Sequence, residues 1–396
     1  MIRSTDRILC THAGALPRDE SLTALIRAQS ARQPVDLAKL EAGLKSGVSD
    51  AVRKQLENRV DSVSDGELSK NNFMHYITSR VSGISLREYE PGNGPVPLSI
   101  IARDRVKFPD FFTGERGGFA SGGKEAVRPM VRQFYCAEAL AYVGQEAVKR
   151  DIANLKAALQ TTKGAPAEAF LASVTPGVIE HWLKNEHYKD DETYLYAIAD
   201  VMRQEYEAIV QAGFTLQIDD PDVADGWQMY PKMTVPQYRE YAELRVAALN
   251  HALRNIPRDK VRIHVCWGSF HGPHEFDLPL KEFVDVLFQV KASMVSIEAA
   301  NPRHEHEWNV FESFRVPPDT VLIPGVVGHC TNFIEHPELI AQRLVRYARL
   351  VGKENVIAGT DCGLGNRTAT PGICWAKLNA MADGAAIASK VLWGRA

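Results

Sequence analysis

The sequence predicts an α/β protein built as a (β/α)8 barrel. Eight short apolar runs alternate with longer amphipathic segments along the chain, which is the pattern of strands followed by helices. Each run is apolar enough to be buried on both faces, as parallel barrel strands are. No Gly-rich phosphate-binding fingerprint follows the first run, and this disfavours the alternative architecture, an open doubly wound sheet.

The individual elements follow from these runs in chain order. The amphipathic segments predict four well-marked helices, and the last of them ends at Gly352, a favoured residue just beyond a helix C-terminus. The four predicted helices span residues 190–212, 235–255, 280–291 and 337–352. The eight predicted strands span residues 8–14, 62–67, 170–175, 214–219, 261–267, 294–299, 320–326 and 355–361.

One connection is much longer than the others. About 100 residues separate the second and third predicted strands, and residues 89–94 and 114–123 within this span are rich in Gly and Pro. We therefore expect one domain over residues 1–396 with an insertion at 71–168 that carries at least one helix, near 135–159. Attached to the C-terminal end of a strand, it can act as a lid over the barrel; an inert surface excursion is the alternative.

Composition excludes several classes of protein. Of the 396 residues, 45% are apolar and 24% are charged, which excludes a disordered chain. The 46 basic and 49 acidic side chains give a net charge of -3, so no electrostatic footprint for nucleic acid is present. No signal-peptide pattern and no long apolar stretch is seen. We expect a cytoplasmic protein with reduced cysteines and with no nucleic-acid or membrane partner.

Four ligand-type residues stand at predicted strand ends. His264 and Cys266 close the fifth strand and point to the same side because strand side chains alternate. Glu298 closes the sixth strand and Cys362 follows the eighth. The carboxyl ends of barrel strands meet at one face, so these side chains can converge there. One imidazole, two thiolates and one carboxylate make a tetrahedral set that suits Zn²⁺; the alternative for each cysteine is a small buried apolar residue.

These four residues also carry a resemblance to a known family. The chain resembles the catalytic barrel of cobalamin-independent methionine synthase, in which a His-x-Cys pair, a Glu and a distant Cys hold zinc in the same order. Two further segments are similar, Asp65-Gly66-Glu67 and Gln217-Ile218-Asp219. The resemblance implies a zinc cofactor, a small thiol and a methyl donor as partners, and it implies that Glu67 and Asp219 bind the amino group of homocysteine.

The same resemblance suggests further site residues. His329, after the seventh strand, matches the family's proposed proton donor and becomes the expected general acid. Trp182 matches an aromatic residue that stacks on the folate ring. His12 closes the first strand, and His304 with Arg303 follows the sixth; we expect these three at the substrate, with Arg303 binding an anionic group and an exposed ion pair as its alternative.

Two departures from the pattern leave the substrates open. Ala15 stands where methionine synthase has a serine that binds the amino-acid carboxylate. The length of 396 residues fits a single-barrel branch of the family, which includes epoxyalkane:coenzyme M transferases. The alkyl donor therefore stays open between methylfolate, methylcobalamin and an epoxide, and the oligomeric state stays open too, with a homo-oligomer among the alternatives.

The residues as a whole predict a zinc-dependent thiol S-alkyl or S-methyltransferase. A free thiol, with a pKa near 8.5, is mostly protonated at neutral pH, and binding to zinc makes it a thiolate that attacks an electrophilic carbon. One alternative is epoxide opening by a thiol. Others are a metal hydrolase, a metal-free decarboxylase of the uroporphyrinogen type, and a non-catalytic zinc- or thiol-binding protein.

Overall fold

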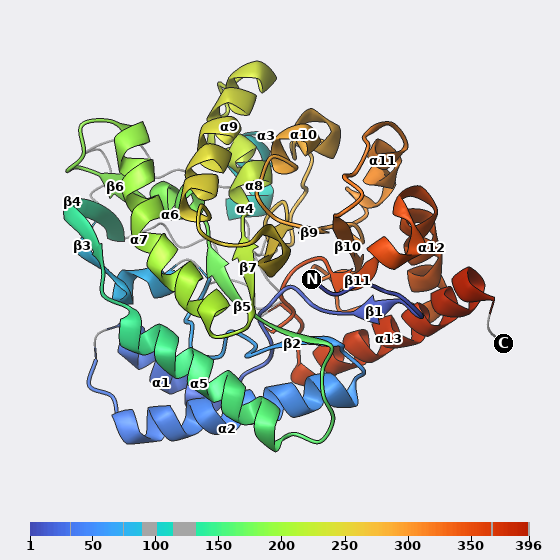
Figure 1. Ribbon diagram of the computed structural model, residues 1–396. Helices are drawn as coiled ribbons and strands as arrows, with labels where there is room; N and C mark the ends of the chain where they lie inside the picture. Colours follow the sequence, from blue (N-terminus) through green and yellow to red (C-terminus); the bar gives the residue numbers. More distant parts are fainter. Residues whose placement is uncertain (32, 74, 89–100, 114–131, 366, 395–396) are drawn as a thin grey trace.

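The chain folds into a barrel of eight parallel strands surrounded by helices (Figure 1), which confirms the predicted fold class. The computed structural model describes residues 1–31, 33–73, 75–88, 101–113, 132–365 and 367–394. Neighbouring strands follow the order β1-β11-β10-β9-β8-β7-β5-β2. Hydrogen bonds close the ring between the first and last of these, from Asp61 N to Cys10 O at 2.8 Å and from Thr11 Oγ1 to Ser62 O at 3.1 Å.

Six of the eight barrel strands are shorter than predicted, mostly at their carboxyl ends. Gly14, Gly66 and Gly268 follow three of the strands, and their φ angles of 127°, 67° and 87° take the backbone out of the ladder. The residues beyond these strand ends therefore form loops on one face of the barrel. The strands are β1 (Leu9–Cys10), β2 (Ser62–Ser64), β5 (Glu168–Val174), β7 (Thr215–Asp219), β8 (Val261–Val265), β9 (Met294–Ile297), β10 (Val321–Val327) and β11 (Ile357–Thr360).

Three of the four predicted helices are confirmed, as α7 (Asp191–Gln211), α9 (Val235–Ala252) and α12 (Pro337–Val351). The fourth, 280–291, is only a short 3-10 turn (Leu280–Glu282) followed by α10 (Val284–Leu287). Other helices around the barrel are α1 (Glu20–Ser30), α2 (Leu37–Glu57), α5 (Gln145–Thr161), α6 (Pro176–Trp182), α8 (Asp222–Met229), α11 (Val310–Ser313) and α13 (Pro371–Trp393). Short 3-10 turns lie at His75–Ser79, Arg258–Lys260, Glu305–Asn309 and Lys353–Asn355.

The predicted insertion contains two strands of a small three-stranded sheet that the sequence did not indicate; the third strand, β6 (Leu183–Asn185), follows α6. Strand β3 (Val81–Glu88) pairs antiparallel with β4 (Arg132–Tyr142), which pairs parallel with β6. The helix expected near 135–159 is therefore wrong in its first third, and α5 begins only at Gln145. The Gly-rich and Pro-rich segments 89–94 and 114–123 lie outside the described residues.

The middle of the insertion lies over the barrel. It contains α3 (Ala102–Lys107) and α4 (Pro109–Thr113), and Arg103 donates to the carbonyls of Trp227 and Tyr230 at the end of α8, both at 2.8 Å. Ile101 and Phe112 pack with Phe270, a residue of the loop after β8, in a separate small core. The insertion thus contacts loops on the carboxyl face of the barrel. In the described part of the chain, no helix is long and apolar enough to cross a membrane.

Candidate active site

A cavity of about 210 Å³ opens at the carboxyl ends of the barrel strands. Its walls come from the loop after β1, the turn after β2, helix α6, and the residues that end β7, β8 and β11. Six of the predicted site residues line it, namely Glu67, Trp182, Asp219, His264, Cys266 and Cys362.

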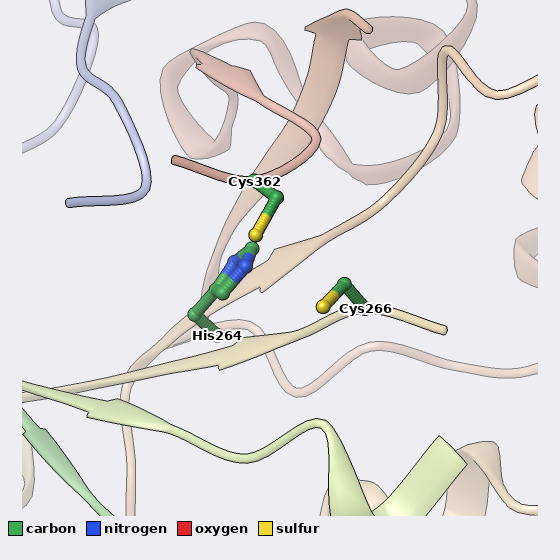
Figure 2. A group of neighbouring side chains, drawn as sticks. All are labelled: His264, Cys266 and Cys362. Carbon is green, nitrogen blue, oxygen red and sulfur yellow. The ribbon is translucent and has the colours of Figure 1, made fainter. Parts of the chain in front are cut away.

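His264, Cys266 and Cys362 form a compact group on one wall of this cavity. Their ligand atoms all lie within 4.8 Å of one another, and Figure 2 shows the three side chains directed toward one centre. His264 Nδ1 lies 3.0 Å from Ser296 Oγ, whereas His264 Nε2 is buried without a hydrogen-bond partner. A buried nitrogen with no partner is costly, and a metal bond is one way to satisfy it. The two sulfurs and this nitrogen fit a soft divalent ion such as zinc.

The two thiols of this group differ in acidity. The hydrogen bond from Cys266 is the main reason why the pKa of Cys362 is held well below its ordinary value. Ser269 Oγ also donates to Cys362 Sγ at 2.8 Å. The same thiol pair, together with burial, raises the pKa of Cys266 well above its ordinary value. As the pH rises, Cys362 therefore loses its proton before Cys266 does.

Glu298, the fourth predicted ligand, is turned away from these three residues. Its carboxylate accepts hydrogen bonds from Trp267 N at 3.0 Å and from Asn301 Nδ2 at 2.9 Å. Its ligand atom groups instead with His329 and Cys330, all within 4.8 Å of one another. The structure thus brings together three of the four predicted ligands and places Glu298 in a neighbouring group.

The predicted general acid, His329, is fully buried and does not line the cavity. Its Nε2 lies 3.1 Å from Cys330 Sγ, and its Nδ1 has no hydrogen-bond partner. Burial lowers the pKa of His329 below its ordinary value, so the neutral ring is favoured near pH 7. Its catalytic role stays a prediction.

Glu67 lies on the opposite side of the cavity in a strained turn. Gly66 and Glu67 both have left-handed backbones, with φ of 67° and 56°, and Asp65 Oδ1 stabilises the turn by accepting from Glu67 N at 3.0 Å. A Cβ atom added to Gly14 would lie 2.1 Å from Glu67 Oε1, so the carboxylate rests directly on this glycine. Lys70 Nζ lies 3.5 Å from Glu67 Oε2 and partly balances its charge.

Asp219 ends β7 and is oriented by a chain of buried polar groups. Gln217 Nε2 donates to Asp219 Oδ1 at 2.7 Å, and Gln217 Oε1 accepts from Arg262 Nε at 2.7 Å. Burial, followed by the nearby charge of Glu67, raises the pKa of Asp219 to about 7. The cavity therefore contains one carboxylate balanced by a lysine and a second that is partly protonated at neutral pH.

The remaining predicted substrate-binding residues lie elsewhere. His12 is buried against Gln55, with Nε2 2.8 Å from Gln55 Oε1. Arg303 donates to the carbonyl of Glu275 at 2.5 Å, and His304 belongs to a buried cluster with Asp277. None of these three predicted residues lines the cavity, and their contacts with a substrate stay predictions.

The sequence analysis missed several polar groups at the cavity. Ser269 contacts the Cys362 sulfur, and Lys70 lies beside Glu67, yet both stand in loops without a recognisable motif. Asp225 also lines the cavity, and burial, together with the charges of nearby aspartates, raises its pKa well above the ordinary value. The signal for Asp225 was a third acidic residue shortly after Asp219, on α8 at the carboxyl end of β7.

Comparison with known proteins identifies relatives over most of the chain. A methionine synthase of Sulfurisphaera tokodaii is 23% identical over 360 residues, which cover 89% of this chain and 85% of the relative. A methionine synthase of Saccharolobus islandicus is 24% identical over 390 residues, covering 96% of this chain and 95% of the relative.

Solved structures agree with the fold. A B12-independent methionine synthase from Shewanella sp. W3-18-1, in complex with selenomethionine, has a TM-score of 0.70 at 19% identity, covering 98% of this chain and 100% of that chain. A structure from Listeria monocytogenes, provisionally named a vitamin-B12-independent methionine synthase, has a TM-score of 0.65 at 16% identity. The match covers 96% of this chain and 98% of that chain. The family model described as "Cobalamin-independent synthase, Catalytic domain" matches residues 152–386. Because this match spans more than half of the chain, the protein belongs to the cobalamin-independent synthase catalytic-domain family.

Proposed function

We propose that this protein is a zinc-dependent S-methyltransferase that acts on a small thiol. The observation that carries the proposal is the position of His264, Cys266 and Cys362 on the wall of a cavity that also contains Glu67 and Asp219. Two thiols and one imidazole on the wall of a substrate-sized cavity suit the activation of a thiol. Typical zinc hydrolases use three His or two His and one Glu as ligands, so a set with two thiols favours thiol activation over hydrolysis.

Zinc held by these three residues would supply a positive charge that keeps a substrate thiol ionised at neutral pH. The protein's own groups prepare the site for this. In the tautomer with the proton on His264 Nδ1, Ser296 Oγ accepts a hydrogen bond from that nitrogen, and the lone pair of Nε2 is free for the metal. Ser269 stabilises the Cys362 thiolate with its hydroxyl hydrogen. Glu298, held by Trp267 and Asn301, is a nearby carboxylate that we propose as the fourth ligand after a change of side-chain rotamer.

Two carboxylates of the cavity suit an amine on the same thiol substrate. Glu67 and Asp219 both line the cavity, and a carboxylate is the usual partner of an ammonium group. Homocysteine carries a thiol and an amine, and the relatives above are named methionine synthases. We therefore propose homocysteine as acceptor, with Trp182 on the cavity wall as the stacking surface for a folate-type methyl donor.

A second function is favoured by one feature of the site. Ala15 lines the cavity and offers no hydroxyl to an amino-acid carboxylate, whereas Arg18 and Arg367 also line it. Guanidinium groups bind carboxylates and sulfonates alike. A thiol with an acidic group but no amine, used to open an epoxide, is therefore the competing proposal.

The test combines metal analysis with a substrate screen. Homocysteine, coenzyme M and glutathione are each offered with methylfolate, methylcobalamin and a small epoxide, and the thioether product is measured. We expect stoichiometric zinc and turnover in the wild type. Cys266→Ser and Cys362→Ser should lose the turnover and the zinc bound at the cysteine site, because each removes a thiolate from that metal group. Cys374→Ser is the matched control, since that cysteine is buried in α13 and belongs to no ligand group of the described residues.

Proton transfer is tested separately. His329→Ala should retain zinc and lose about 10²- to 10⁴-fold in rate, the usual contribution of a general acid. Asp225→Asn is the comparison variant, because Asp225 lines the cavity and its raised pKa makes it an alternative proton donor. Full activity of either cysteine variant would contradict the proposal. Absence of stoichiometric zinc would favour a metal-free decarboxylase, and zinc with thiol binding but no turnover would indicate a sensor.

A further inference from the structure

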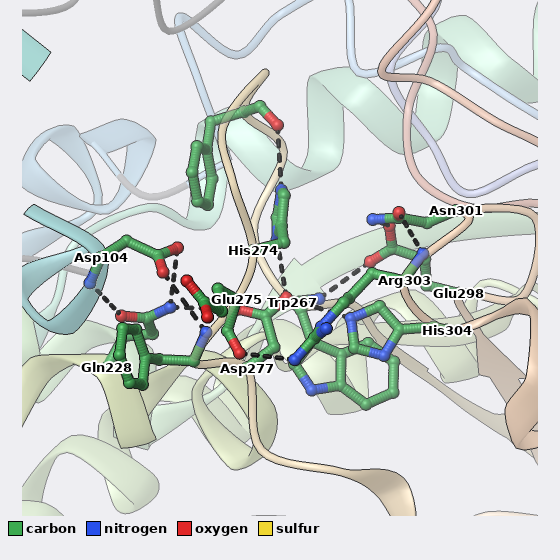
Figure 3. Close-up of polar contacts among 12 residues, drawn as sticks. Asp104, Gln228, Trp267, His274, Glu275, Asp277, Glu298, Asn301, Arg303 and His304 are labelled. Atoms are coloured by element: carbon green, nitrogen blue, oxygen red, sulfur yellow. Dashed lines mark hydrogen bonds and ion pairs between the residues drawn. The ribbon is translucent and has the colours of Figure 1, made fainter. Parts of the chain in front are cut away.

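A second group of ligand-type side chains lies outside the cavity. His274 and Asp277 come from the loop after β8, and His304 comes from the loop after β9. His274 Nδ1 lies 2.6 Å from Asp277 Oδ2, and His304 Nε2 lies 3.0 Å from the same oxygen. All three residues are buried, with exposed fractions of 4%, 6% and 3%. Figure 3 shows both imidazole rings directed at this carboxylate.

In each of these three residues, the polar atom that faces away from the other two already has a hydrogen-bond partner. His274 Nε2 donates to the carbonyl of Phe270 at 3.0 Å, and His304 Nδ1 lies 2.9 Å from Glu307 Oε2. Gln228 Nε2 donates to Asp277 Oδ1 at 3.1 Å. Metal-binding histidines have this pattern, because the nitrogen that faces away from the ion is normally bonded to a carboxylate or a backbone carbonyl. His274 Nδ1, Asp277 Oδ2 and His304 Nε2 therefore lie close together, while the other polar atom of each side chain is hydrogen-bonded elsewhere.

We propose that His274 Nδ1, Asp277 Oδ2 and His304 Nε2 form a second divalent-cation site, separate from the cysteine site. Two imidazoles and one carboxylate are borderline ligands that suit zinc and related ions. Zinc bonds of about 2.0 Å in a tetrahedral arrangement separate ligand atoms by about 3.3 Å. The two observed separations of 2.6 and 3.0 Å need only a small expansion to reach that value.

Charge balance agrees with this assignment. Without an ion, His274 donates from both nitrogens, and His304 faces a carboxylate at each nitrogen. Two positive rings then balance Asp277 and Glu307. A divalent ion that replaces the two inner protons leaves the net charge unchanged, so the buried surroundings accept it without a new uncompensated charge.

The position of the cluster gives the ion a structural role. The ring of Trp267, the residue after Cys266, stacks on His304 with centroids 3.8 Å apart. His274 has a left-handed backbone, with φ of 54°, and its Nε2 holds the carbonyl of Phe270, whose side chain lines the cavity. An ion here would fix the loop that carries Ser269 and Phe270 over the cysteine site.

The experiment counts metal ions per chain. The protein is produced with added Zn²⁺, dialysed into metal-free buffer and analysed by mass spectrometry of the metal. We expect two equivalents in the wild type, one in His304→Gln and one in the Cys266→Ser/Cys362→Ser double variant. The matched control is His306→Gln, an exposed histidine on the same turn, which should keep two. Retention of the cysteine-site zinc in His304→Gln also shows that this variant folds.

Cobalt provides an independent readout of ligand type. Co²⁺ bound to the double cysteine variant should show ligand-field absorption without the sulfur-to-cobalt charge-transfer band that a thiolate site gives. One equivalent in the wild type that His304→Gln leaves unchanged would overturn the proposal and identify the cluster as a hydrogen-bonded pair of imidazolium ions. One equivalent lost in His304→Gln but not in the cysteine variant would support it and contradict the zinc-thiol function instead.

Discussion

His12 illustrates how a single buried residue can support the site without lining it. Its Nε2 faces Gln55 Oε1, and its Nδ1 accepts from the backbone N–H of Gly14 at 3.2 Å. These contacts suit the neutral ring with its proton on Nε2. Burial lowers the pKa of His12 to about 4. Since Gly14 packs directly against the Glu67 carboxylate, His12 holds the turn on which that carboxylate rests.

This pKa predicts how stability depends on pH. The unfolded chain binds a proton at His12 below its ordinary pKa of 6.5, and the folded chain does so only near 4. Stability from this residue is therefore fully present above pH 6.5 and decreases as the pH falls toward 4, by about 3 kcal/mol in total. Urea unfolding at pH 7, 6, 5 and 4 measures it. His12→Gln should show a shallower decrease than the wild type, and equal slopes would contradict the assignment.

The sequence could predict a site residue only where its side-chain type and its position at the end of a strand identify it. His264 and Cys266 were found because alternate strand residues share a face, and Cys362 because it follows another barrel strand. The sequence could not show that Glu298 turns toward Trp267 and Asn301. That choice depends on two donors from the tertiary structure, and the same holds for Ser269 beside Cys362.

At the scale of elements, the buried barrel strands were the easiest to predict. Strands β7 and β8 are completely buried, as predicted, although polar residues such as Gln217 and Arg262 alternate with their apolar residues. Strand β4 was mistaken for part of a helix because Ala, Glu and Leu, which are good helix formers, dominate residues 137–141. Its pairing with β3 and β6 overrides this local preference. Such pairing involves residues far apart in the chain and leaves no local signal.

Two glycines of helix α13 allow the effect of tight packing to be compared with the effect of helix propensity. A Cβ added to Gly384 would lie 2.5 Å from Ile340 Cβ on α12, whereas one added to Gly372 would have Thr370 Oγ1 as its nearest atom, at 3.8 Å. Gly384→Ala should lower the free energy of unfolding by about 1–2 kcal/mol, because overpacking outweighs the gain in helix propensity. Gly372→Ala should be neutral or stabilising. Urea unfolding compares them, and a stabilised Gly384→Ala would refute the close packing of α12 on α13.

At the scale of the whole molecule, one buried arginine joins the insertion to the barrel. Arg80 precedes β3 and pairs with Asp151 on α5 at 2.5 Å and with Glu205 on α7 at 2.9 Å. Tyr76 and Tyr142, from either side of the insertion, also donate to Glu205, at 2.8 and 2.7 Å. The insertion, whose own helix α5 provides Asp151, is therefore attached to the barrel helix α7 by charge as well as by apolar packing.

Removal of this arginine should be costly. Arg80→Met leaves two buried carboxylates without their cation, and the free energy of unfolding should fall by about 3–5 kcal/mol. Arg53→Met is the control, because Arg53 pairs with Asp50 and Glu57 at the surface, where such pairs contribute about 1 kcal/mol or less. Denaturant unfolding measures both. Similar losses in the two variants would show that the buried network does not anchor the insertion.

Among the described barrel strands, β11 is the last to be synthesised and β1 the first, and these two strands pair side by side. Cys362 follows β11, so the three-residue metal group is assembled only after the final strand has docked beside the initial one. An ion that binds this completed group favours the closed ring by mass action. Metal loading would then mark the end of folding, and a nascent chain would have little affinity for the ion until its C-terminal quarter had emerged and found its place.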